Sequence, residues 1–303
     1  MSARDAVNAE TAVELIPVGE PGDGPGDGLV GVAATDDGAV WFTLSVTGKV
    51  GRRAPDGTLS FLELGPEARP VGVRAATEDT VWVVDRTGDR LLHLGAGIRV
   101  VGELAVPAPG ALPLDVVTLP DGTTWFTEQF GEALGRIDIL GRVEEYPVGS
   151  ERGPSGIASS GDSVWFSLQG HSPALGHVRG GDAAIEFVEL PLGSGPLGVA
   201  VAEDGAVWTA LHAADALARV GRDRSVTLLP LEEGAAPFTV ASAPDGSVWA
   251  SLWGADALLR IAPDGAELRI ALPEDSGPRG LAVAPDGSLW AALVSGALAR
   301  VHP

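Results

Sequence analysis

The sequence predicts an all-β fold, a seven-bladed β-propeller in which each blade has four short antiparallel strands. Seven of the eight tryptophans recur at intervals of 40 to 43 residues along the 303-residue chain. Asp-Gly turns separate apolar runs of strand length in most of these repeats, and no segment shows a sustained helical period. The tryptophans of the series are Trp41, Trp82, Trp125, Trp165, Trp208, Trp249 and Trp290.

The segments of each repeat follow one order, which the repeat at 198–220 illustrates. A run of small residues ("GVAVA") leads to an acidic turn ("EDG"), then to the tryptophan strand ("AVWTAL"), a loop, and a third strand ("ALARV"). A fourth apolar segment follows, as in "IEFVELPLG". Gly accepts a positive φ without a Cβ clash, so "PDG" predicts hairpins between the first two strands at 120, 244 and 285, and between the last two at 55 and 263.

The seventh repeat lacks a fourth strand, because the chain stops at "ALARVHP". The N-terminal segment "AVELIPVG" at 12–19 resembles the fourth strand "VEEYPVG" at 143–149. We therefore expect residues 12–19 to form the outermost strand of the last blade, which closes the ring and removes an open sheet edge. The predicted product is a single domain over residues 1–303, with residues 1–11 as a flexible N-terminal segment.

Composition excludes several classes of function. The formal net charge of -21 repels phosphate backbones, so nucleic acid is not an expected partner. No apolar run is long enough to span a membrane, and the start "MSARDAVNAETAVELI" lacks a basic segment followed by an apolar one, so we expect no membrane partner and a cytoplasmic location. Without cysteine there is no thiolate nucleophile or thiolate metal site. The oligomeric state stays open, with a monomer as the working expectation.

Two sets of loops should converge on a central pocket at the face opposite the Asp-Gly turns of the first hairpins. One set contains the "GPxG"-like motifs that start each blade, and the other follows each tryptophan strand. Convergent loops on a rigid scaffold are the usual place for binding chemistry, so a small organic molecule is the expected ligand. The residues before the second Gly of the blade-start motifs, or their equivalents, are Val30, Val71, Leu114, Ser155, Leu197, Phe238 and Arg279.

The third and fourth positions after each tryptophan supply the other expected pocket residues. They are Leu44 and Ser45, Asp85 and Arg86, Glu128 and Gln129, Leu168 and Gln169, Leu211 and His212, Leu252 and Trp253, and Leu293 and Val294. The lining is therefore predicted to be mainly apolar, with a few polar points. The expected ligand contacts are Phe238, Trp253, Arg86, Asp85, Ser155 and Gln169. The aromatic pair offers flat contact area, while Arg86 and Arg279 suit a carboxylate or a polarised carbonyl.

The candidate catalytic residues are His212, Glu128, Arg279 and His171. His171 and His212 are the histidines in pocket-side loops, and they belong to adjacent blades next to the blade of Glu128. Converging imidazoles and a carboxylate could hold a divalent metal or act as general acid and base. Alternatively, each histidine is an ordinary loop residue and Glu128 pairs with Arg86.

The segments "WFTEQFGEALGRIDILGRVEEYPVG" and "GPSGIASSGDSVWFSL" resemble the virginiamycin B lyase family, also called streptogramin lyases. This resemblance extends over all seven repeats and implies a seven-bladed propeller. It also implies the family's reaction, in which a cyclic depsipeptide antibiotic is linearised by elimination across its ester linkage. The family uses a magnesium ion and a histidine general base for this step.

The family's catalytic positions hold other residues in this chain. Histidines of the family's "PHG"-like motifs in the sixth and seventh blades correspond to "PFT" and "PRG", that is, to Phe238 and Arg279. The metal-binding Glu of the last blade corresponds to Val294, and a Tyr of the first motif falls near Val30. The resemblance thus implies the scaffold and the pocket, with any catalytic set rebuilt on other blades. A magnesium ion is implied by the resemblance only, and the cofactor stays unknown.

Two functional hypotheses follow, and the first is favoured. In the first, the protein is a lyase-like enzyme that performs elimination or cyclisation on a bulky cyclic or aromatic natural product. His212 would be the general base, and Arg279 or a metal at Glu128 would stabilise negative charge. In the second, the propeller is catalytically silent and binds a small molecule such as an antibiotic, or serves as a scaffold. A third reading is a protein partner on the ring's rim.

Overall fold

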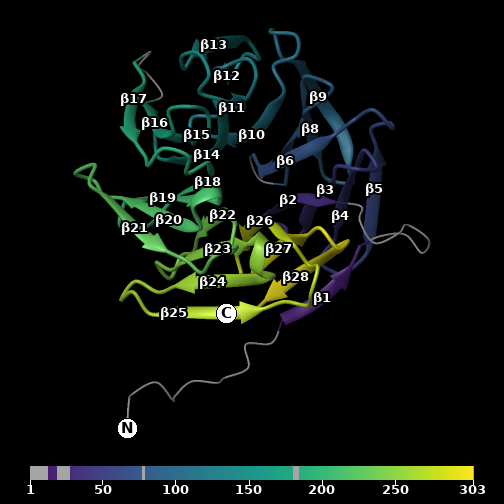
Figure 1. Cartoon of the computed structure of the whole chain (residues 1–303). Coiled ribbons are helices and arrows are strands. Elements are labelled where there is room, and N and C mark those ends of the chain that lie inside the picture. Colours follow the sequence, from purple (N-terminus) through teal and green to yellow (C-terminus); the bar gives the residue numbers. More distant parts are fainter. Residues whose placement is uncertain (1–12, 19–27, 77–78, 180–183, 303) are drawn as a thin grey trace.

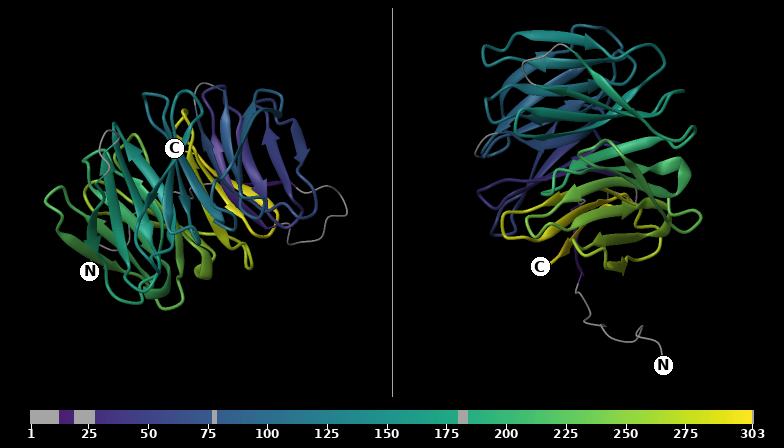
Figure 2. Two further views of the ribbon diagram at one scale, coloured as in Figure 1. Left: turned by 90° about the horizontal axis from the view of Figure 1, so that it is seen from above. Right: turned by 90° about the vertical axis from the view of Figure 1, so that its left-hand side faces the viewer.

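The computed structural model describes residues 13–18, 28–76, 79–179 and 184–302, and it forms a ring of seven four-stranded antiparallel sheets (Figure 1). The predicted seven-bladed propeller is confirmed. The flexible segment expected at residues 1–11, and the ends of the expected strand at 12 and 19, lie outside the described residues. Viewed along two further directions, the strands of each blade run between the two faces of the ring (Figure 2).

The strands of the first four blades follow one another along the chain. Blade 1 contains β2 (Leu29–Ala34), β3 (Val40–Leu44), β4 (Lys49–Arg53) and β5 (Leu59–Glu63). Blade 2 contains β6 (Pro70–Ala75), β7 (Val81–Asp85), β8 (Arg90–Gly95) and β9 (Arg99–Ala105). Blade 3 contains β10 (Pro113–Thr118), β11 (Thr124–Glu128), β12 (Ala133–Ile137) and β13 (Val143–Pro147). Blade 4 contains β14 (Pro154–Ser160), β15 (Ser163–Leu168), β16 (Ala174–Arg179) and β17 (Glu186–Glu189).

The remaining blades include the two helical turns and the strand that closes the ring. Blade 5 contains β18 (Pro196–Val201), β19 (Val207–Leu211), β20 (Ala216–Val220) and β21 (Val226–Pro230), with η1 (His212–Ala214) after β19. Blade 6 contains β22 (Pro237–Ser242), β23 (Val248–Leu252), β24 (Ala257–Ile261) and β25 (Glu267–Ala271), with η2 (Trp253–Ala255) after β23. Blade 7 contains β26 (Pro278–Val283), β27 (Leu289–Leu293), β28 (Ala297–Val301) and β1 (Val13–Pro17). Across the described ranges, neither helical turn nor any other helix has the length and apolar character needed to cross a membrane.

The repeated tryptophan anchors each blade through a contact with its third strand. In blade 7, Trp290 lies opposite Arg300, whose guanidinium is 5.2 Å from the indole ring. The same guanidinium lies 2.7 Å from Asp286 in the first hairpin turn, and Asp286 accepts a 2.9 Å hydrogen bond from the Ser288 backbone. The Asp-Gly turn and the tryptophan are therefore held by one arginine. Equivalent ion pairs join Arg52 to Asp37, Arg219 to Asp204, and Arg260 to Asp245.

The innermost strands of neighbouring blades approach so closely that a side chain does not fit at certain positions. A Cβ added to Gly72 of β6 would lie 2.6 Å from the carbonyl oxygen of Leu114 in β10. Hydroxyl groups of the second strands bridge adjacent blades at the same level. Thr43 accepts from the Gly31 amide and donates to the Val71 carbonyl, each at 2.8 Å. Contacts between β2 and β26 close the ring of inner strands around a central tunnel.

The N-terminal strand completes the last blade, as the sequence predicts. β1 pairs with β28 in antiparallel register, from Val13 opposite Val301 to Pro17 opposite Ala297. Val18 is fully buried beside the strand and packs into the core between blades 7 and 1. Residues from the two ends of the chain thus share one sheet.

Removing residues 1–18 should destabilise the protein by roughly 3 kcal/mol or more, because Val18 and the half-buried Ile16 leave the core. The exposed edge of β28 should also promote self-association. Urea unfolding and size-exclusion chromatography measure the two effects. A variant lacking residues 1–11 keeps β1 and is the matched control. Equal stability of the two shortened chains would show that β1 does not close the ring.

Candidate functional site

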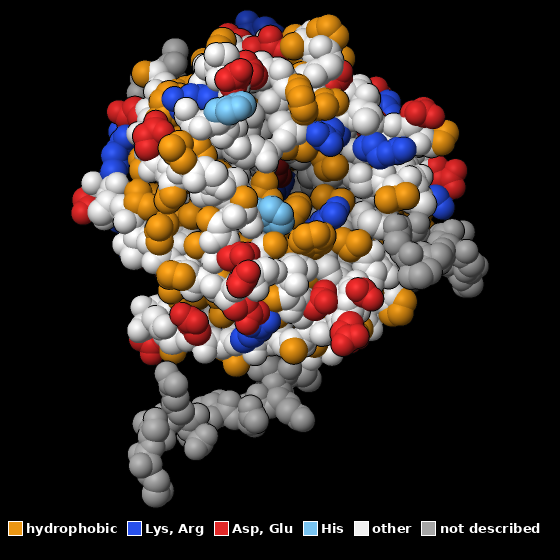
Figure 3. All heavy atoms as spheres, in the orientation of Figure 1, with side chains coloured by type: hydrophobic (Ala, Val, Ile, Leu, Met, Phe, Trp, Pro, Cys, Tyr) orange, Lys and Arg blue, Asp and Glu red, His pale blue; other side chains and the backbone are white. Residues whose placement is uncertain are grey.

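The central tunnel contains a cavity of about 380 Å³ on the face opposite the first-hairpin turns. In the space-filling view this cavity opens as a hollow at the centre of the ring, with arginine or lysine side chains at its edge (Figure 3). All seven residues predicted from the blade-start motifs line it. They are Val30, Val71, Leu114, Ser155, Leu197, Phe238 and Arg279. Apolar side chains and glycines share this lining with nine polar or charged side chains.

A second cavity of about 280 Å³ occupies the other half of the tunnel. Its walls come from the later residues of the same inner strands. Val32, Arg74 and Leu281 border both cavities, so they mark the level at which the tunnel divides. These three side chains form the floor of the first cavity.

The positions after the tryptophans divide into two groups. The fourth positions Ser45, Arg86, Gln129 and Gln169 line the cavity, whereas His212, Trp253 and Val294 are not among its lining residues. The third positions are the last residues of the second strands, and every one of them is buried between blades. A residue inside the ladder is covered by the neighbouring blades on both sides, whereas the next residue is free to turn toward the tunnel. Arg86 donates a 2.8 Å hydrogen bond to Gln129, so it does not pair with Glu128 as the sequence suggested.

The two carboxylates expected in the pocket, Asp85 and Glu128, lie outside the cavity lining. Asp85 is fully buried, accepts from the Arg69 amide at 2.9 Å and forms an ion pair with Arg90 at 2.9 Å. Glu128 is also fully buried, and neither of its carboxylate oxygens has a hydrogen-bond partner among the described residues. Burial, followed by the nearby carboxylate of Glu145, raises the pKa of Glu128 to about 7.

The expected convergence of Glu128, His171 and His212 is not found. The His171 side chain is 84% exposed and lies 3.7 Å from Glu151, whereas His212 packs among aromatic residues of blade 6. Over the described part of the chain, no group of three or more histidines and carboxylates gathers closely enough to hold a metal ion. The side chains therefore do not fit the magnesium ion that the family resemblance implies.

Four predicted residues do come together at one side of the cavity. The His212 ring packs edge-on against Phe238 with centroids 6.2 Å apart, and it lies 5.9 Å from the Trp253 ring. The guanidinium of Arg279 lies 5.5 Å from the Phe238 ring. Blades 5, 6 and 7 each contribute to this cluster, because their loops follow one another around the mouth. Phe238 and Arg279 line the cavity, whereas His212 and Trp253 are not among its lining residues and adjoin it through the contact of His212 with Phe238.

One nitrogen of His212 is occupied by a backbone contact. Its Nδ1 lies 3.2 Å from the carbonyl oxygen of Pro237, which can only accept, so Nδ1 carries the proton in this contact. The lone pair of the neutral ring is then on Nε2. This arrangement leaves Nε2 as the nitrogen that can accept a proton from a ligand.

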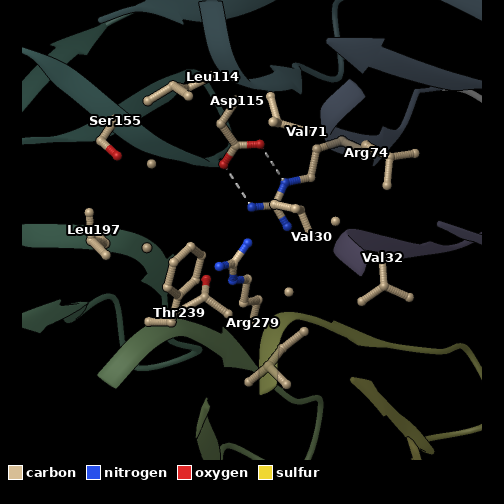
Figure 4. A pocket seen from close by; sticks show the side chains of 18 of the residues that line it. Val30, Val32, Val71, Arg74, Leu114, Asp115, Ser155, Leu197, Thr239 and Arg279 are labelled. Atoms are coloured by element: carbon tan, nitrogen blue, oxygen red, sulfur yellow. Dashed lines mark hydrogen bonds and ion pairs between the residues drawn. The ribbon is translucent and has the colours of Figure 1, made fainter. Parts of the chain in front are cut away.

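An ion pair between neighbouring inner strands was not predicted from the sequence. Arg74 of β6 binds Asp115 of β10 through two hydrogen bonds, from Nε at 3.0 Å and from Nη2 at 2.8 Å (Figure 4). Asp115 also accepts from the Ile157 amide at 3.3 Å. The negative charge of the Asp115 carboxylate raises the pKa of Arg74.

The sequence contains a signal for this pair that was not used. Five inner strands have Gly at the position of Asp115, namely Gly31, Gly72, Gly156, Gly198 and Gly280. Five inner strands have Ala at the position of Arg74, namely Ala33, Ala158, Ala200, Ala241 and Ala282. Arg74 and Asp115 are thus charged exceptions at tunnel-facing positions where most blades have Ala and Gly, and their opposite charges allow them to pair.

Comparisons with known proteins agree with this architecture. The sequence matches the virginiamycin B lyase family over residues 12–301. It is 35% identical to a virginiamycin B lyase of Nocardia farcinica over 197 residues, which is 65% of this chain and 67% of the relative. A shorter match to a virginiamycin B lyase of Bordetella parapertussis is 48% identical over 48 residues, covering 16% of this chain and 15% of that one.

Solved structures show the same fold at lower identity. A streptogramin B lyase structure superposes with a TM-score of 0.88 at 22% identity, covering 95% of this chain and 97% of the other. A catalytically inactive virginiamycin B lyase from Staphylococcus aureus with quinupristin superposes with a TM-score of 0.88 at 20% identity, covering 96% and 99%. Since the family match extends over nearly the whole described ring, the chain belongs to the virginiamycin B lyase family.

Proposed function

We propose that the protein is a lyase-like enzyme that acts on a bulky cyclic or aromatic natural product in the central cavity. The observation that carries this proposal is the cluster of His212, Phe238 and Arg279 beside a cavity with apolar walls. A proton acceptor, an aromatic surface and a cation stand together there, and this is what an elimination at an activated ester needs.

The chemistry assigned to these residues is a proton abstraction coupled to loss of a carboxylate. Nε2 of His212 accepts the proton from carbon, the C–H electrons form a new double bond, and the C–O bond breaks with its electron pair leaving on the carboxylate. Arg279 stabilises the negative charge that develops on that oxygen. Water is not consumed, so product and substrate have the same mass. No step is assigned to a metal, because the described side chains do not fit one.

Quinupristin is a suitable first substrate, because a related lyase has been solved with it. Incubation with the protein should give a ring-opened isomer of unchanged mass, separated by liquid chromatography and detected by mass spectrometry. Replacing His212 by Ala should lower the turnover rate by about 10²- to 10⁴-fold, the usual contribution of a general base. The thermal midpoint should stay nearly constant, because His212 is only half-buried.

His302→Ala is the matched control, since this histidine is half-exposed and lies 3.8 Å from Glu14 at the far edge of blade 7. Its turnover should equal that of the unmodified protein. Quinupristin recovered intact, or turned over equally by the His212→Ala variant, would count against the proposed reaction.

A catalytically silent binding protein is the second candidate. It is favoured by Phe238, Arg279 and Val294, which occupy positions where the family resemblance implies catalytic histidines and a metal-binding glutamate. Native mass spectrometry detects the retained ligand, and liquid chromatography of the released ligand then distinguishes the two functions, because an isomer has the same mass but a different retention time. A ligand retained and released chemically unchanged supports binding, whereas release of its isomer supports the lyase.

A further inference from the structure

We propose that the first cavity contains a carboxylate-binding site, formed by Arg279 together with the edge of the Arg74 guanidinium that faces away from Asp115. The ligand class is a carboxylic acid attached to an aromatic or cyclic apolar body. The inference rests on the proposed function only in placing the ligand in this cavity, and it does not depend on any turnover.

Arg279 is a cation without a counter-ion. Among the described residues it forms no ion pair, and its buried Nε has no hydrogen-bond partner. Burial lowers the pKa of Arg279. The guanidinium lies 5.5 Å from the Phe238 ring centroid and Arg279 lines the cavity, so its N–H groups are within reach of a ligand there. A buried donor of this kind gains most from an anionic acceptor.

Arg74 presents a second guanidinium to the same space. Its Nε and Nη2 are bound to Asp115, so Nη1 lies on the far edge of the group from that carboxylate. Figure 4 shows the Arg74 and Arg279 side chains entering the cavity from β6 and β26, with their guanidinium groups pointing toward one another. Two cations that face each other repel unless an anion lies between them. Asp115 holds Arg74 in position but is on the side away from Arg279.

The cavity lining carries a net positive charge, whereas the protein as a whole is negatively charged. The charged residues that line the cavity are three arginines and one aspartate, Arg74, Arg86, Arg279 and Asp115. They leave a local excess of positive charge inside a chain of net charge -21. Salt screens exposed surface charges beyond about 8–10 Å, so the nearby arginines determine which ligands the cavity accepts.

The shape of the site selects a carboxylate on an apolar body. One arginine without an ion pair among the described residues and one free edge of a second offer a donor group to each of the two oxygens of a single carboxylate. The walls above the floor are Val30, Val71, Leu114, Leu197 and Phe238, which suit an apolar ring system. A carboxylate released by the proposed elimination would also form at this site. The site would therefore bind the product as well as any ligand that already carries a carboxylic acid.

Dansylglycine and dansylglycinamide test the inference directly. The two fluorescent probes share one aromatic body and differ only in carrying a carboxylate or a neutral amide. Fluorescence titration of the full chain should show dansylglycine binding about 10- to 100-fold more tightly, as expected for charge-assisted hydrogen bonds in a partly buried site. Replacing Arg279 by Met removes the guanidinium but keeps an unbranched apolar stem, and it should reduce this preference to less than about threefold. Arg279→Lys should give an intermediate preference, because it retains charge without the planar fork.

Arg142→Met is the matched control, because Arg142 is 74% exposed and pairs with Asp138 in a turn remote from the cavity. It should leave the preference unchanged. Equal binding of the two probes, no binding of dansylglycine, or a preference that persists in Arg279→Met would each overturn the inference. Loss of quinupristin turnover in His212→Ala with the carboxylate preference retained would separate this site from the proposed reaction.

Discussion

Replacing Glu128 by Leu should raise the stability of the protein at pH 8 by roughly 2–3 kcal/mol, while changing it little at pH 4.5. Glu128 is fully buried at the end of β11 and its oxygens lack partners among the described residues. Leucine fits the position, since it is the residue that five other blades use there. These equivalents are Leu44, Leu168, Leu211, Leu252 and Leu293.

The pH dependence follows from the raised pKa. Burial first, and then the carboxylates of Glu145 and Asp89, raise the pKa of Glu128 from 4.5 to about 7 in the folded chain. Below pH 4.5 the group is protonated in both folded and unfolded chains and imposes no penalty. Between pH 4.5 and about 7 only the unfolded chain releases the proton, so stability falls as the pH rises. At about 1.4 kcal/mol for each pH unit between the two pKa values, the cost at pH 8 is roughly 3 kcal/mol.

Urea unfolding at pH 4.5 and pH 8 measures this effect in both proteins. The difference between the two variants should widen across that interval. Glu63→Leu is the control, because the Glu63 side chain is 79% exposed at the edge of blade 1. If the Glu128→Leu protein has the same stability as the unmodified chain at pH 8, the buried Glu128 carboxylate is stabilised by its surroundings and the prediction fails.

Replacing Asp115 by Ala should destabilise the protein by roughly 2–3 kcal/mol. The change leaves Arg74 without its counter-ion inside the tunnel and removes an acceptor for the Ile157 amide. Removing one partner of a buried ion pair is costly, and the value is kept low here because the Arg74 side chain is 31% exposed. The combined change of Asp115 and Arg74 to Ala should recover at least about 1 kcal/mol of this loss, because it removes both charges together.

A double-mutant cycle over the two single variants and the combined variant measures the coupling by urea unfolding. Each variant needs a circular dichroism spectrum to confirm that the sheets are intact. A combined variant whose loss equals the sum of the two single losses would contradict the role of Asp115 as the partner of Arg74.

Much of the architecture could be predicted because it repeats. The spacing of the tryptophans determines the number of blades, and the missing fourth strand of the last repeat assigns β1 to blade 7. The blade-start residues were located for the same reason, since seven equivalent positions around a ring must face one tunnel. Phe238 and Arg279 were found in this way without any knowledge of distances.

The candidate site was predicted less well at residues whose direction depends on where a strand ends. Asp85 and Glu128 were placed in the pocket, but β7 and β11 extend through these residues and direct them between blades. His171 was grouped with His212 because adjacent blades carry them, yet its loop holds it in solvent. Arg74 and Asp115 were missed because each is a single exception to the repeat, in a different strand. Only the three-dimensional register shows that their side chains meet.

A crystal structure of the protein grown with dansylglycine tests most directly whether the first cavity, on the face opposite the first-hairpin turns, is the ligand site. The carboxylate is predicted to lie within hydrogen-bond distance of the Arg279 guanidinium, with the naphthalene ring against Phe238. Dansylglycine bound in the opposite half of the tunnel, or on the outer rim with this cavity empty, would contradict the account.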